Sequence, residues 1–534
     1  MVLNGSQIVM EVLLEHKVEV VFGYPGGAVL NIYDALYEYK DKIRHIMPVD
    51  ECGACHAADG YARASGKTGV VIATSGPGAT NLVTPLATAY MDSVPLVAIT
   101  GNVPTGIMGK DSFQEVYIAG ITMPITKHNF IVRDIKDLAR TLREAFIIAN
   151  SGRKGPVLVD IPKDISVAKC EYTKHFPKKP SQKSAEFKDE LAQILTLIKQ
   201  SRKPLVYFGG GAKDASENLL AFMKKAQIPC VHTTMSAGTI SHKEPLNAGL
   251  LGMHGRVTCN EIMSEADLIL AIGTRFSDRV ALNPREFAKN AKKVHIDIDI
   301  SEVDKNVSVD CSVVGDLNEV LSALCEKVSP ANSDEWIQSI QKRLEKERAQ
   351  KGDKNAFEPR NIFEYAVSKT KENAIYATDV GQHQMWAVQF IRHAKPRSFL
   401  TSGGLGTMGF GYGAAIGAKV ACPKRPVLHI TGDGSFLMNL NEVATAVEYK
   451  LPIITIILNN HTLGMVRQWQ STFYGKRYSS TDINKKVDFI AVAKGFGARG
   501  YSCKNLSEFE KAFDEAFEKY DMILAPAAPT TAPE

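Results

Sequence analysis

The chain has 534 residues, of which 45% are hydrophobic and 23% are charged, and its 63 basic and 58 acidic side chains nearly cancel. This length predicts several domains, and the balanced charge gives no sign of a nucleic-acid partner. No apolar stretch approaches the roughly 18 residues that span a bilayer. Residues 1–20 contain Glu11, Glu15 and Glu19, which is atypical of an export signal. We therefore expect a cytoplasmic protein without a membrane partner.

Short runs rich in β-branched residues alternate with amphipathic helical stretches. In chain order these runs are VEVVFGY, TGVVIAT, VPLVAIT, GPVLVDIP, KPLVYFG, ADLILAIG, KKVHIDIDI, RPVLHIT and LPIITIIL. The alternation is typical of α/β proteins with doubly wound parallel sheets. Polar stretches at 174–188 and 345–359 interrupt it and are predicted to be linkers. The sequence thus predicts three doubly wound domains, at 1–170, 188–343 and 358–534.

Residues 49–55, VDECGAC, allow two interpretations. Cys52 and Cys55 form a C-x-x-C motif, which is typical of a redox dithiol or half of a zinc site. However, the nine cysteines are irregularly spaced, and no second motif completes a zinc tetrahedron. This favours free cysteines and leaves Glu51 as the alternative carrier of the chemistry.

A candidate metal site follows two strands of the third domain, in the stretch HITGDGSFLMNLNEVATAVEYKLPIITIILNN. The first strand leads to Asp433 and the second to Asn459 and Asn460. In open α/β sheets, ligands bind beyond the carboxyl ends of the strands. Carboxylate and amide oxygens suit Mg²⁺, and the glycines beside Asp433 allow backbone amides to approach a diphosphate. A GDG sequence alone would be a common turn, but this context predicts a metal-diphosphate site.

The segment from GDGSF to LNN is similar to the thiamine diphosphate motif. Over nearly all of residues 1–515 the chain resembles the catalytic subunits of the acetohydroxyacid synthase (acetolactate synthase) family. The resemblance is carried by YPGGAVLNIYDAL, GYARASGKTGVVIATSGPGATN, ITKHNF, LGMHG, TDVGQHQMW, TSGGLGTMGFG and NNHTLGMVRQWQ. It implies an N-terminal pyrimidine-binding domain, a central FAD-contacting domain and a C-terminal diphosphate-binding domain. It also implies a homodimer or homotetramer with active sites at the dimer interface, and a possible regulatory small subunit.

The resemblance assigns Glu51 to the glutamate that hydrogen-bonds the pyrimidine ring of the cofactor. A carboxylate in an apolar cleft can share its proton with that ring nitrogen and so activate the cofactor. Cys52 and Cys55 then have no part in the chemistry. The family usually has R-H-E-Q-G-A-A at 49–55, and the additional acid Asp50 is expected to disturb the protonation of Glu51.

The resemblance implies further thiamine diphosphate and metal positions. Met408 matches the residue that forces the cofactor into its bent shape, although a methionine beside a glycine-rich turn is usually core filler. The positions for the diphosphate and its surroundings are Gly381, Gln382, His383, Gly406, Met408, Gly434, Ser435 and Met465. Mg²⁺ would be bound by Asp433, Asn460 and Thr462. The other catalytic positions are Gly27, Gln114 and Lys127.

The implied reaction is decarboxylation of pyruvate and carboligation to a second 2-oxo acid, which gives 2-acetolactate or, from 2-oxobutyrate, 2-aceto-2-hydroxybutyrate. This is a transferase reaction of branched-chain amino-acid biosynthesis. Arg279 matches the cation for the acceptor carboxylate, and Trp469 matches the indole that shapes the acceptor pocket. Without the resemblance, Arg279 would be read as a surface ion pair and Trp469 as a core aromatic residue. Phe113 and Val466 complete the substrate positions.

FAD is the second cofactor that the resemblance implies, bound largely by the central domain. Glycine loops after strands and an acid at a strand end suit a dinucleotide, although FGGGA alone could be a plain tight turn. The matching positions are Gly210, Gly211, Met253, His254, Gly255, Gly273, Arg275, Asp297, Ile298 and Asp316. The segment HTTMSAGTISHKEP departs from the family pattern.

The C-terminal stretch MILAPAAPTTAPE is atypical of the family and is expected to lack its active-site lid, which would favour aldehyde release over carboligation. Three alternatives stay open beside the biosynthetic enzyme. They are another thiamine-dependent 2-oxo acid decarboxylase, the catabolic acetolactate synthase, and an inactive truncated homologue.

Overall fold

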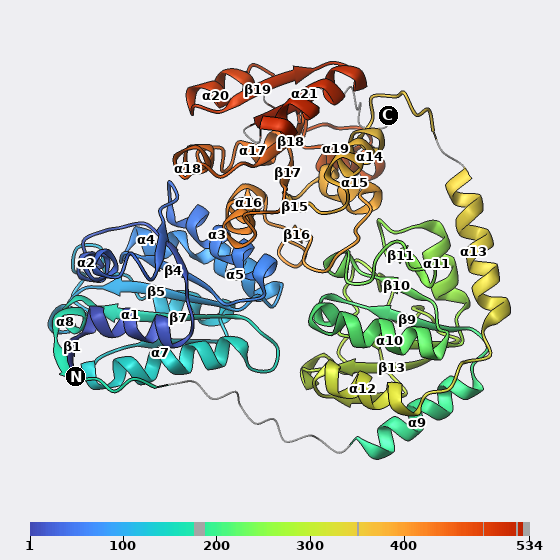
Figure 1. Cartoon of the computed structure of the whole chain (residues 1–534), viewed down its shortest axis with the longest axis horizontal. Coiled ribbons are helices and arrows are strands. Elements are labelled where there is room, and N and C mark those ends of the chain that lie inside the picture. The colour runs from blue at the N-terminus through green and yellow to red at the C-terminus, as the bar shows by residue number, and fades with distance from the viewer. Residues whose placement is uncertain (176–186, 350–351, 484, 520–521, 527–534) are drawn as a thin grey trace. The chain divides into compact units, whose positions relative to one another are not determined.

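The computed structural model describes residues 1–175, 187–349, 352–483, 485–519 and 522–526. These residues contain three six-stranded sheets and a short antiparallel pair, β1 (Val2–Asn4) with β8 (Lys169–Glu171). The chain divides into two compact units, the first with the first and third sheets and the second with the second sheet (Figure 1). Helices cover the parallel strands, so the expected α/β fold class is confirmed.

The first sheet has the strand order β3-β2-β4-β5-β7-β6, and its ladders are parallel. In that order the strands are Arg44–Ile46, Val20–Gly23, Gly69–Ala73, Leu96–Asn102, Pro156–Pro162 and His128–Ile131. The longer helices are α1 (Gly5–Glu15), α2 (Leu30–Glu38), α3 (Glu51–Ser65), α5 (Val83–Met91) and α7 (Ile135–Asn150).

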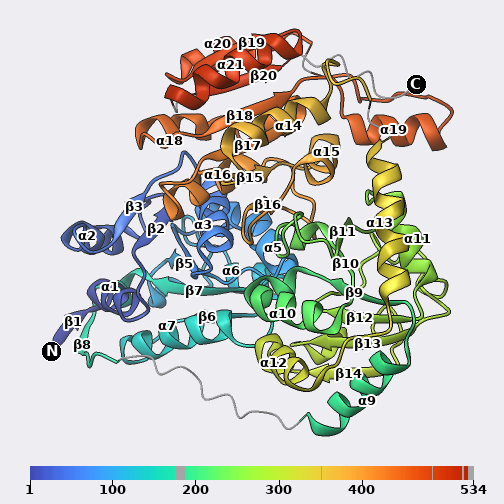
Figure 2. The same cartoon turned by 45° about the vertical axis from the view of Figure 1, so that its right-hand side comes forward.

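The second sheet has the order β11-β10-β9-β12-β13-β14, also with parallel ladders. Its strands are Asn247–Leu250, Cys230–His232, Pro204–Phe208, Leu268–Ile272, Lys292–Asp297 and Cys311–Val314. Its helices are α9 (Lys188–Gln200), α10 (Ser216–Ala226), α11 (Val257–Glu265), α12 (Leu317–Lys327), α13 (Asp334–Ala349) and α14 (Pro359–Thr370). Helices α10 and α12 lie side by side over this sheet (Figures 1 and 2).

The third sheet has the order β16-β15-β17-β18-β20-β19. Its strands are Phe399–Thr401, Ile375–Thr378, Val427–Gly432, Ile454–Leu458, Met522–Pro526 and Arg499–Cys503. Its helices are α15 (Gln382–Phe390), α16 (Phe410–Ala421), α17 (Asp433–Phe436), α18 (Glu442–Glu448), α19 (Gly464–Phe473), α20 (Phe489–Gly495) and α21 (Leu506–Lys519).

Helices α3 and α16 join the first and third sheets into one unit and lie side by side in both views (Figures 1 and 2). Both helices are rich in Gly and Ala, which lets their backbones touch. A Cβ atom at Gly60 would lie 2.2 Å from the Ala414 carbonyl oxygen, and one at Gly417 would lie 1.9 Å from that of Ala57. A larger side chain at either glycine would therefore push the helices apart.

The structure differs from the sequence expectations in two places. The predicted linker at 345–359 is wrong for its first residues, because α13 continues to Ala349 and α14 begins at Pro359. Trp336, Ile340 and Leu344 form a buried stripe at helical spacing, and the Glu, Lys and Arg residues around them are strong helix formers. Residues 176–186 of the other linker lie outside the described residues.

The second difference concerns the C-terminal stretch. Met522–Pro526 form strand β20, which pairs with both β18 and β19 and is therefore an interior strand of the third sheet. Residues 527–534 of the predicted atypical end lie outside the described residues. The three domain boundaries stay a prediction.

Candidate functional site

The carboxyl ends of β17 and β18 bring the predicted metal ligands to one edge of the third sheet. Gly432, the last residue of β17, pairs with Leu458, the last residue of β18. The residues that follow, Asp433 and Asn460, therefore leave the sheet at the same edge. Asp433 is buried, and the Oδ1 atom of Asn460 accepts a hydrogen bond of 3.0 Å from the Thr462 amide.

Several buried polar side-chain atoms in this part of the chain have no hydrogen-bond partner among the described residues. They are Gln382 Oε1, His383 Nε2, Asn459 Oδ1 and Thr462 Oγ1. Buried polar atoms in folded proteins are nearly always satisfied, so such a group calls for a ligand or ordered water. The described residues hold no cluster of three or more His, Cys, Asp or Glu for a metal. One carboxylate with amide and carbonyl oxygens nevertheless fits Mg²⁺, which commonly takes its remaining ligands from phosphate and water.

The imidazole of His383 is neutral at this edge, because burial lowers its pKa to about 4. Nearby, Asp379 accepts hydrogen bonds from His429, at 3.0 Å, and from the Gly411 amide, at 2.8 Å. Burial opposes ionisation of Asp379, but these partners lower its pKa overall. The hydroxyl of Ser435 donates to the Val380 carbonyl oxygen at 3.0 Å. The segments 379–383 and 433–435 are therefore fixed to the same core.

Met408 lies close to the glycine that follows Asp433. A Cβ atom at Gly434 would be 3.9 Å from Met408 Cε. The loop before Met408 is held by the first domain, since the Gly404 amide donates to Asp92 at 2.7 Å and the hydroxyls of Thr407 and Thr88 are 2.6 Å apart. Gly406 has a φ of +74°, a conformation that favours glycine. The structure thus places three predicted positions, Gly406, Met408 and Gly434, in one neighbourhood.

A buried ionic network supports the same loop. Arg63 of α3 is paired with Asp59 and, at 2.9 Å, with Asp92, and it donates to the Thr401 carbonyl oxygen at 2.9 Å. Asp92 in turn accepts hydrogen bonds from the backbone of the Met408 loop. No local sequence pattern indicates this network, because its members are far apart in the chain.

Glu51 is the first residue of α3 and is only 7% exposed. The side-chain amide of Asn81 donates to Glu51 Oε2 at 2.9 Å. A Cβ atom at Gly78 would lie 2.8 Å from Glu51 Oε1, so this glycine makes room for the carboxylate. Asn81 was missed as a functional residue, although it ends the segment SGPGATN that carries part of the resemblance.

The thiol interpretation of residues 49–55 finds no support. Burial raises the pKa of Cys52 to about 12, with Asp50 adding to the shift, and burial raises the pKa of Cys55 well above its usual value. Both thiols are therefore protonated near neutral pH and are poor nucleophiles and metal ligands. Asp50 caps α3 by accepting a hydrogen bond of 2.8 Å from the Gly53 amide.

The other predicted positions of the first domain are exposed or half-buried. Gly27 is exposed, and Phe113 is 88% exposed. Gln114 has a φ of +59° and adjoins Gly76, where a Cβ atom would lie 2.8 Å from the Gln114 carbonyl oxygen. The ammonium of Lys127 donates to the carbonyl oxygens of Ile148 and Ser151 at the end of α7. Its predicted place at the mouth of the site stays a prediction.

Helix α19 carries the predicted substrate positions of the third domain and buries none of its side chains. Val466 and Trp469 are each 51% exposed, and Met465 is half-buried. The rings of Trp469 and Phe473 meet edge to face, with their centroids 6.1 Å apart. Within the described residues this helix presents an aromatic face to its surroundings.

The positions predicted for FAD lie at the carboxyl ends of strands in the second unit. The Gly211 amide, after β9, donates to the Gly273 carbonyl oxygen, after β12, at 3.0 Å. Asp297 ends β13, and burial raises its pKa. Ile298 follows it, and Gly210 begins the turn after β9.

The remaining FAD positions include a residue that is hydrogen-bonded to Arg279 and a residue that caps a helix. The Met253 amide donates to the Arg279 carbonyl oxygen at 2.8 Å, and burial together with the Arg279 charge lowers the pKa of His254. Arg275 is half-buried after Gly273. Asp316 accepts a hydrogen bond of 2.8 Å from the Asn318 amide and so caps α12.

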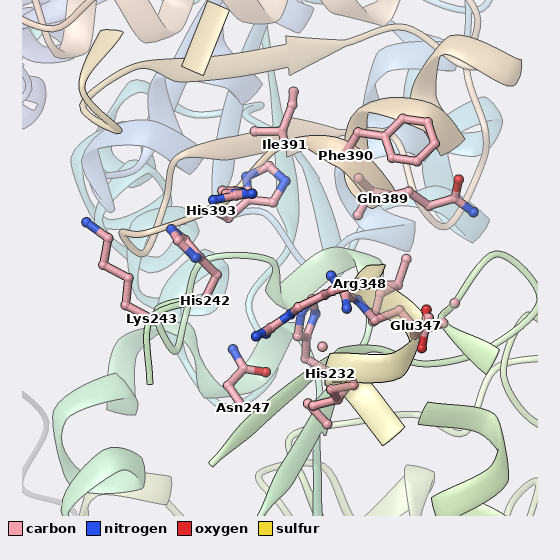
Figure 3. A pocket seen from close by; sticks show the side chains of 18 of the residues that line it. His232, His242, Lys243, Asn247, Glu347, Arg348, Gln389, Phe390, Ile391 and His393 are labelled. Carbon is pink, nitrogen blue, oxygen red and sulfur yellow. The ribbon is translucent and has the colours of Figure 1, made fainter. Parts of the chain in front are cut away.

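A separate cavity of about 920 Å³ lies within the second unit. Figure 3 shows Gln389, Phe390 and Ile391 on one side of it and His232 and Asn247 on the other. Burial lowers the pKa of His232 to about 4, so its imidazole is neutral near pH 7. Of the residues predicted to contact FAD, Gly255 lines this cavity. The cavity therefore does not coincide with the predicted FAD positions.

No helix among the described residues is long and apolar enough to cross a membrane.

Comparisons with known proteins identify the family. Residues 3–121, 191–324 and 379–524 match, respectively, the N-terminal TPP binding domain, the central domain and the C-terminal TPP binding domain of thiamine pyrophosphate enzymes. The chain is 43% identical to the "Probable acetolactate synthase large subunit" of Methanococcus aeolicus, over 96% of this chain and 90% of the relative. It is 44% identical to the "Acetolactate synthase large subunit" of Parasynechococcus marenigrum (93% of this chain, 83% of the relative) and of Corynebacterium glutamicum (97% and 85%). The chain therefore belongs to the acetolactate synthase large-subunit family of thiamine pyrophosphate enzymes.

Proposed function

We propose that the chain decarboxylates pyruvate and joins the remaining two-carbon unit to a second 2-oxo acid, as the catalytic subunit of an acetolactate synthase in branched-chain amino-acid biosynthesis. Two pyruvate anions and a proton give one 2-acetolactate anion and carbon dioxide. With 2-oxobutyrate as acceptor, the product is 2-aceto-2-hydroxybutyrate. The observation that supports this most strongly is the buried Glu51 carboxylate, held by Asn81.

Bound thiamine diphosphate supplies the carbanion chemistry that breaks one carbon–carbon bond and forms the other. Glu51 would hold and move a proton at a ring nitrogen of the pyrimidine, with Asn81 fixing the orientation of the carboxylate. Asp433, Asn460 and the Thr462 carbonyl would bind Mg²⁺. The unsatisfied Gln382 Oε1 atom would accept a hydrogen bond from water beside the diphosphate, and the His383 imidazole would bond to the diphosphate or to that water.

Binding of the acceptor 2-oxo acid is assigned to a cation for its carboxylate and to apolar residues for its side chain. Arg279 would bind the acceptor carboxylate through its guanidinium, which is exposed and lies 3.8 Å from the Met253 sulfur. Trp469 and Val466 on α19 would shape the pocket for the acceptor side chain, with Phe113, Gln114 and Lys127 near its mouth. FAD would bind at the carboxyl ends of β9, β12 and β13, where the glycines allow close approach of a diphosphate.

We also propose a homodimer, or a tetramer built from it, with active sites at the interface. Large apolar side chains are exposed on two parts of the first unit. Phe113, Tyr117 and Met123 are 88%, 66% and 62% exposed, and Phe473 beside Trp469 is 71% exposed. Exposed apolar groups of this kind mark interaction surfaces. A regulatory small subunit is a further possible partner, and a cytoplasmic location is proposed.

Product analysis of the purified chain with pyruvate, thiamine diphosphate, Mg²⁺ and FAD tests this proposal, with and without 2-oxobutyrate. Acetolactate, and a preference for 2-oxobutyrate as acceptor, would support the biosynthetic carboligase. Acetaldehyde without acetolactate would favour a 2-oxo acid decarboxylase. Acetolactate formed without any need for FAD would favour the catabolic enzyme, and cofactor binding without turnover would favour an inactive homologue.

A further inference from the structure

Glu442, the first residue of α18, places a buried carboxyl group against the start of α3. The side chain is completely buried. The Val49 amide donates to its two oxygens at 3.2 and 3.3 Å, and the Thr445 hydroxyl donates to Oε2 at 2.6 Å. Glu442 is absent from the thiamine diphosphate, Mg²⁺, FAD and substrate positions proposed above. Its partner Val49 lies two residues before Glu51.

The first turn of α3 is shaped to receive this carboxyl group. A Cβ atom at Gly53 would lie 1.9 Å from Glu442 Oε1, so a side chain at this position would collide with the carboxyl group. Asp50 caps the same turn through the Gly53 amide, and the Asn441 side-chain amide lies 3.5 Å from Asp50 Oδ2. The turn that carries Glu51 is therefore held from outside by the segment that begins α18.

The surroundings of Glu442 make its carboxyl group costly to bury. Burial raises the pKa of Glu442 to about 7, and the Asp50 carboxylate adds to the shift. The other titratable groups that interact with it are Cys52 and Tyr412, whose pKa values are raised by burial first and by Glu442 in addition. The described residues that interact most strongly with Glu442 are Thr445, Val49 and Asp50, and none of them is a cation. A buried acid without a cation is costly, so its hydrogen bonds to Val49 and Thr445 must be kept.

We propose that Glu442 is a positioning residue for Glu51: its carboxyl group binds the Val49 amide and packs against Gly53, and so fixes the first turn of α3 and the direction of the Glu51 side chain. This inference rests on the proposed function of Glu51. It assigns Glu442 no contact with cofactor or substrate. Its effect on catalysis is expected to be large, because a displacement of about 1 Å can cost on the order of 100-fold in rate.

The test compares Glu442→Ala with Glu442→Gln in the full-length protein. Gln keeps the size of the side chain and one acceptor oxygen, whereas Ala removes both. We expect Glu442→Ala to lower kcat about 10- to 100-fold with little change in the KM for pyruvate, and Glu442→Gln to restore kcat to within about threefold of the parent. Asp160→Asn is the matched control, because Asp160 is also buried with a pKa raised to about 7 by burial, but it bonds to Thr100 and Asn102 in the first sheet. This control is expected to leave kcat unchanged.

A second readout needs neither cofactor nor turnover. Amide hydrogen exchange of peptides that cover residues 49–55 should be about tenfold faster in Glu442→Ala than in the parent protein, and parent-like in Glu442→Gln and Asp160→Asn. If the parent protein makes no acetolactate but exchange is still faster in Glu442→Ala than in the parent, the positioning of α3 is upheld while the proposed function fails. Unchanged exchange in Glu442→Ala, or equal loss of kcat in the Ala and Gln variants, would overturn the inference.

A complementary substitution tests the contact itself. Gly53→Ala should lower Tm in the parent protein, because the new Cβ collides with the Glu442 carboxyl group. In the Glu442→Ala background the same change should raise Tm, because space is free and Ala is the better helix former. Gly53→Ala lowering Tm equally in both backgrounds would contradict the proposed contact.

Discussion

The two ends of the proposed site differ in how their polar groups are satisfied. At the start of α3, Glu51 has a protein partner in Asn81, and Asp50 and Glu442 hold the turn around it. At the edge of the third sheet, buried atoms of Gln382, His383 and Thr462 have no partner among the described residues. The polar groups around Glu51 are satisfied by the protein itself, whereas those at the edge of the third sheet require a ligand or water to be satisfied. This contrast suggests that the acid is preorganised and that the diphosphate edge is completed by the cofactor and its metal.

The largest effect is expected from Glu51→Gln, which keeps the shape of the side chain and removes its proton transfer. We predict a loss of about 100- to 10,000-fold in kcat, the range that general acid–base catalysis supplies. Binding of thiamine diphosphate, measured by titration calorimetry, should change little, because the diphosphate edge is untouched. If Glu51→Gln lost thiamine diphosphate binding as well as kcat, the start of α3 and the diphosphate edge could not be assigned separate roles.

Asp433→Asn is the reciprocal change at the diphosphate edge. It should weaken Mg²⁺-dependent binding of thiamine diphosphate at least about 100-fold, since even changes to outer-shell partners of metal sites cost about 10- to 100-fold. Excess cofactor and Mg²⁺ should restore much of kcat, because Glu51 is intact. Calorimetry with and without Mg²⁺ measures this. Affinity equal to that of the parent protein would show that Asp433 does not bind the metal.

Asn81→Ala tests whether the acid is held by its partner. A hydrogen bond to a charged group is worth about 1.5–3 kcal/mol, so kcat should fall roughly 10-fold or more. Asn150→Ala, at an exposed hydrogen bond to Thr68, serves as the control. An unchanged rate would mean that Asn81 does not orient Glu51.

The smallest predicted effect is on stability. Glu442 and Asp160 both have pKa values raised to about 7 by burial, so they favour folding while protonated. Their contribution is fully present below their unfolded pKa values, near 4, and is lost as the pH rises through about 7. Glu442→Gln should therefore reduce the fall in the free energy of unfolding between about pH 5 and pH 8 by on the order of 2 kcal/mol. Urea unfolding at several pH values measures this, and an unchanged pH dependence would argue that Glu442 is ionised throughout.

Much of the fold follows from local sequence, because buried parallel strands are continuous runs of β-branched residues. All nine predicted runs contain a strand, and the α/β class and the family are confirmed. Strands β10, β15 and β16 are three or four residues long and too short to show a pattern. Strand β20 contains Pro and Ala, and it is recognisable only by its neighbours in the sheet.

The residues of the candidate site also fall into those that the sequence could predict and those that it could not. Asp433 and Asn460 could be found from sequence, because each lies two residues after a predicted strand. Glu442 could not, because its contact with Val49 joins residues 393 positions apart. The pairing of Asp92 with the Met408 loop is equally remote in sequence. Such contacts depend on the packing of α3 against α16, which no local pattern reveals.

A crystal structure of the chain with thiamine diphosphate and Mg²⁺ tests the account most directly. We predict the metal on Asp433, Asn460 and the Thr462 carbonyl, and the carboxyl group of a Glu51, from the same chain or a second copy, about 2.6–3.2 Å from a pyrimidine ring nitrogen. A cofactor bound away from this edge, or a pyrimidine that no Glu51 reaches, would contradict it.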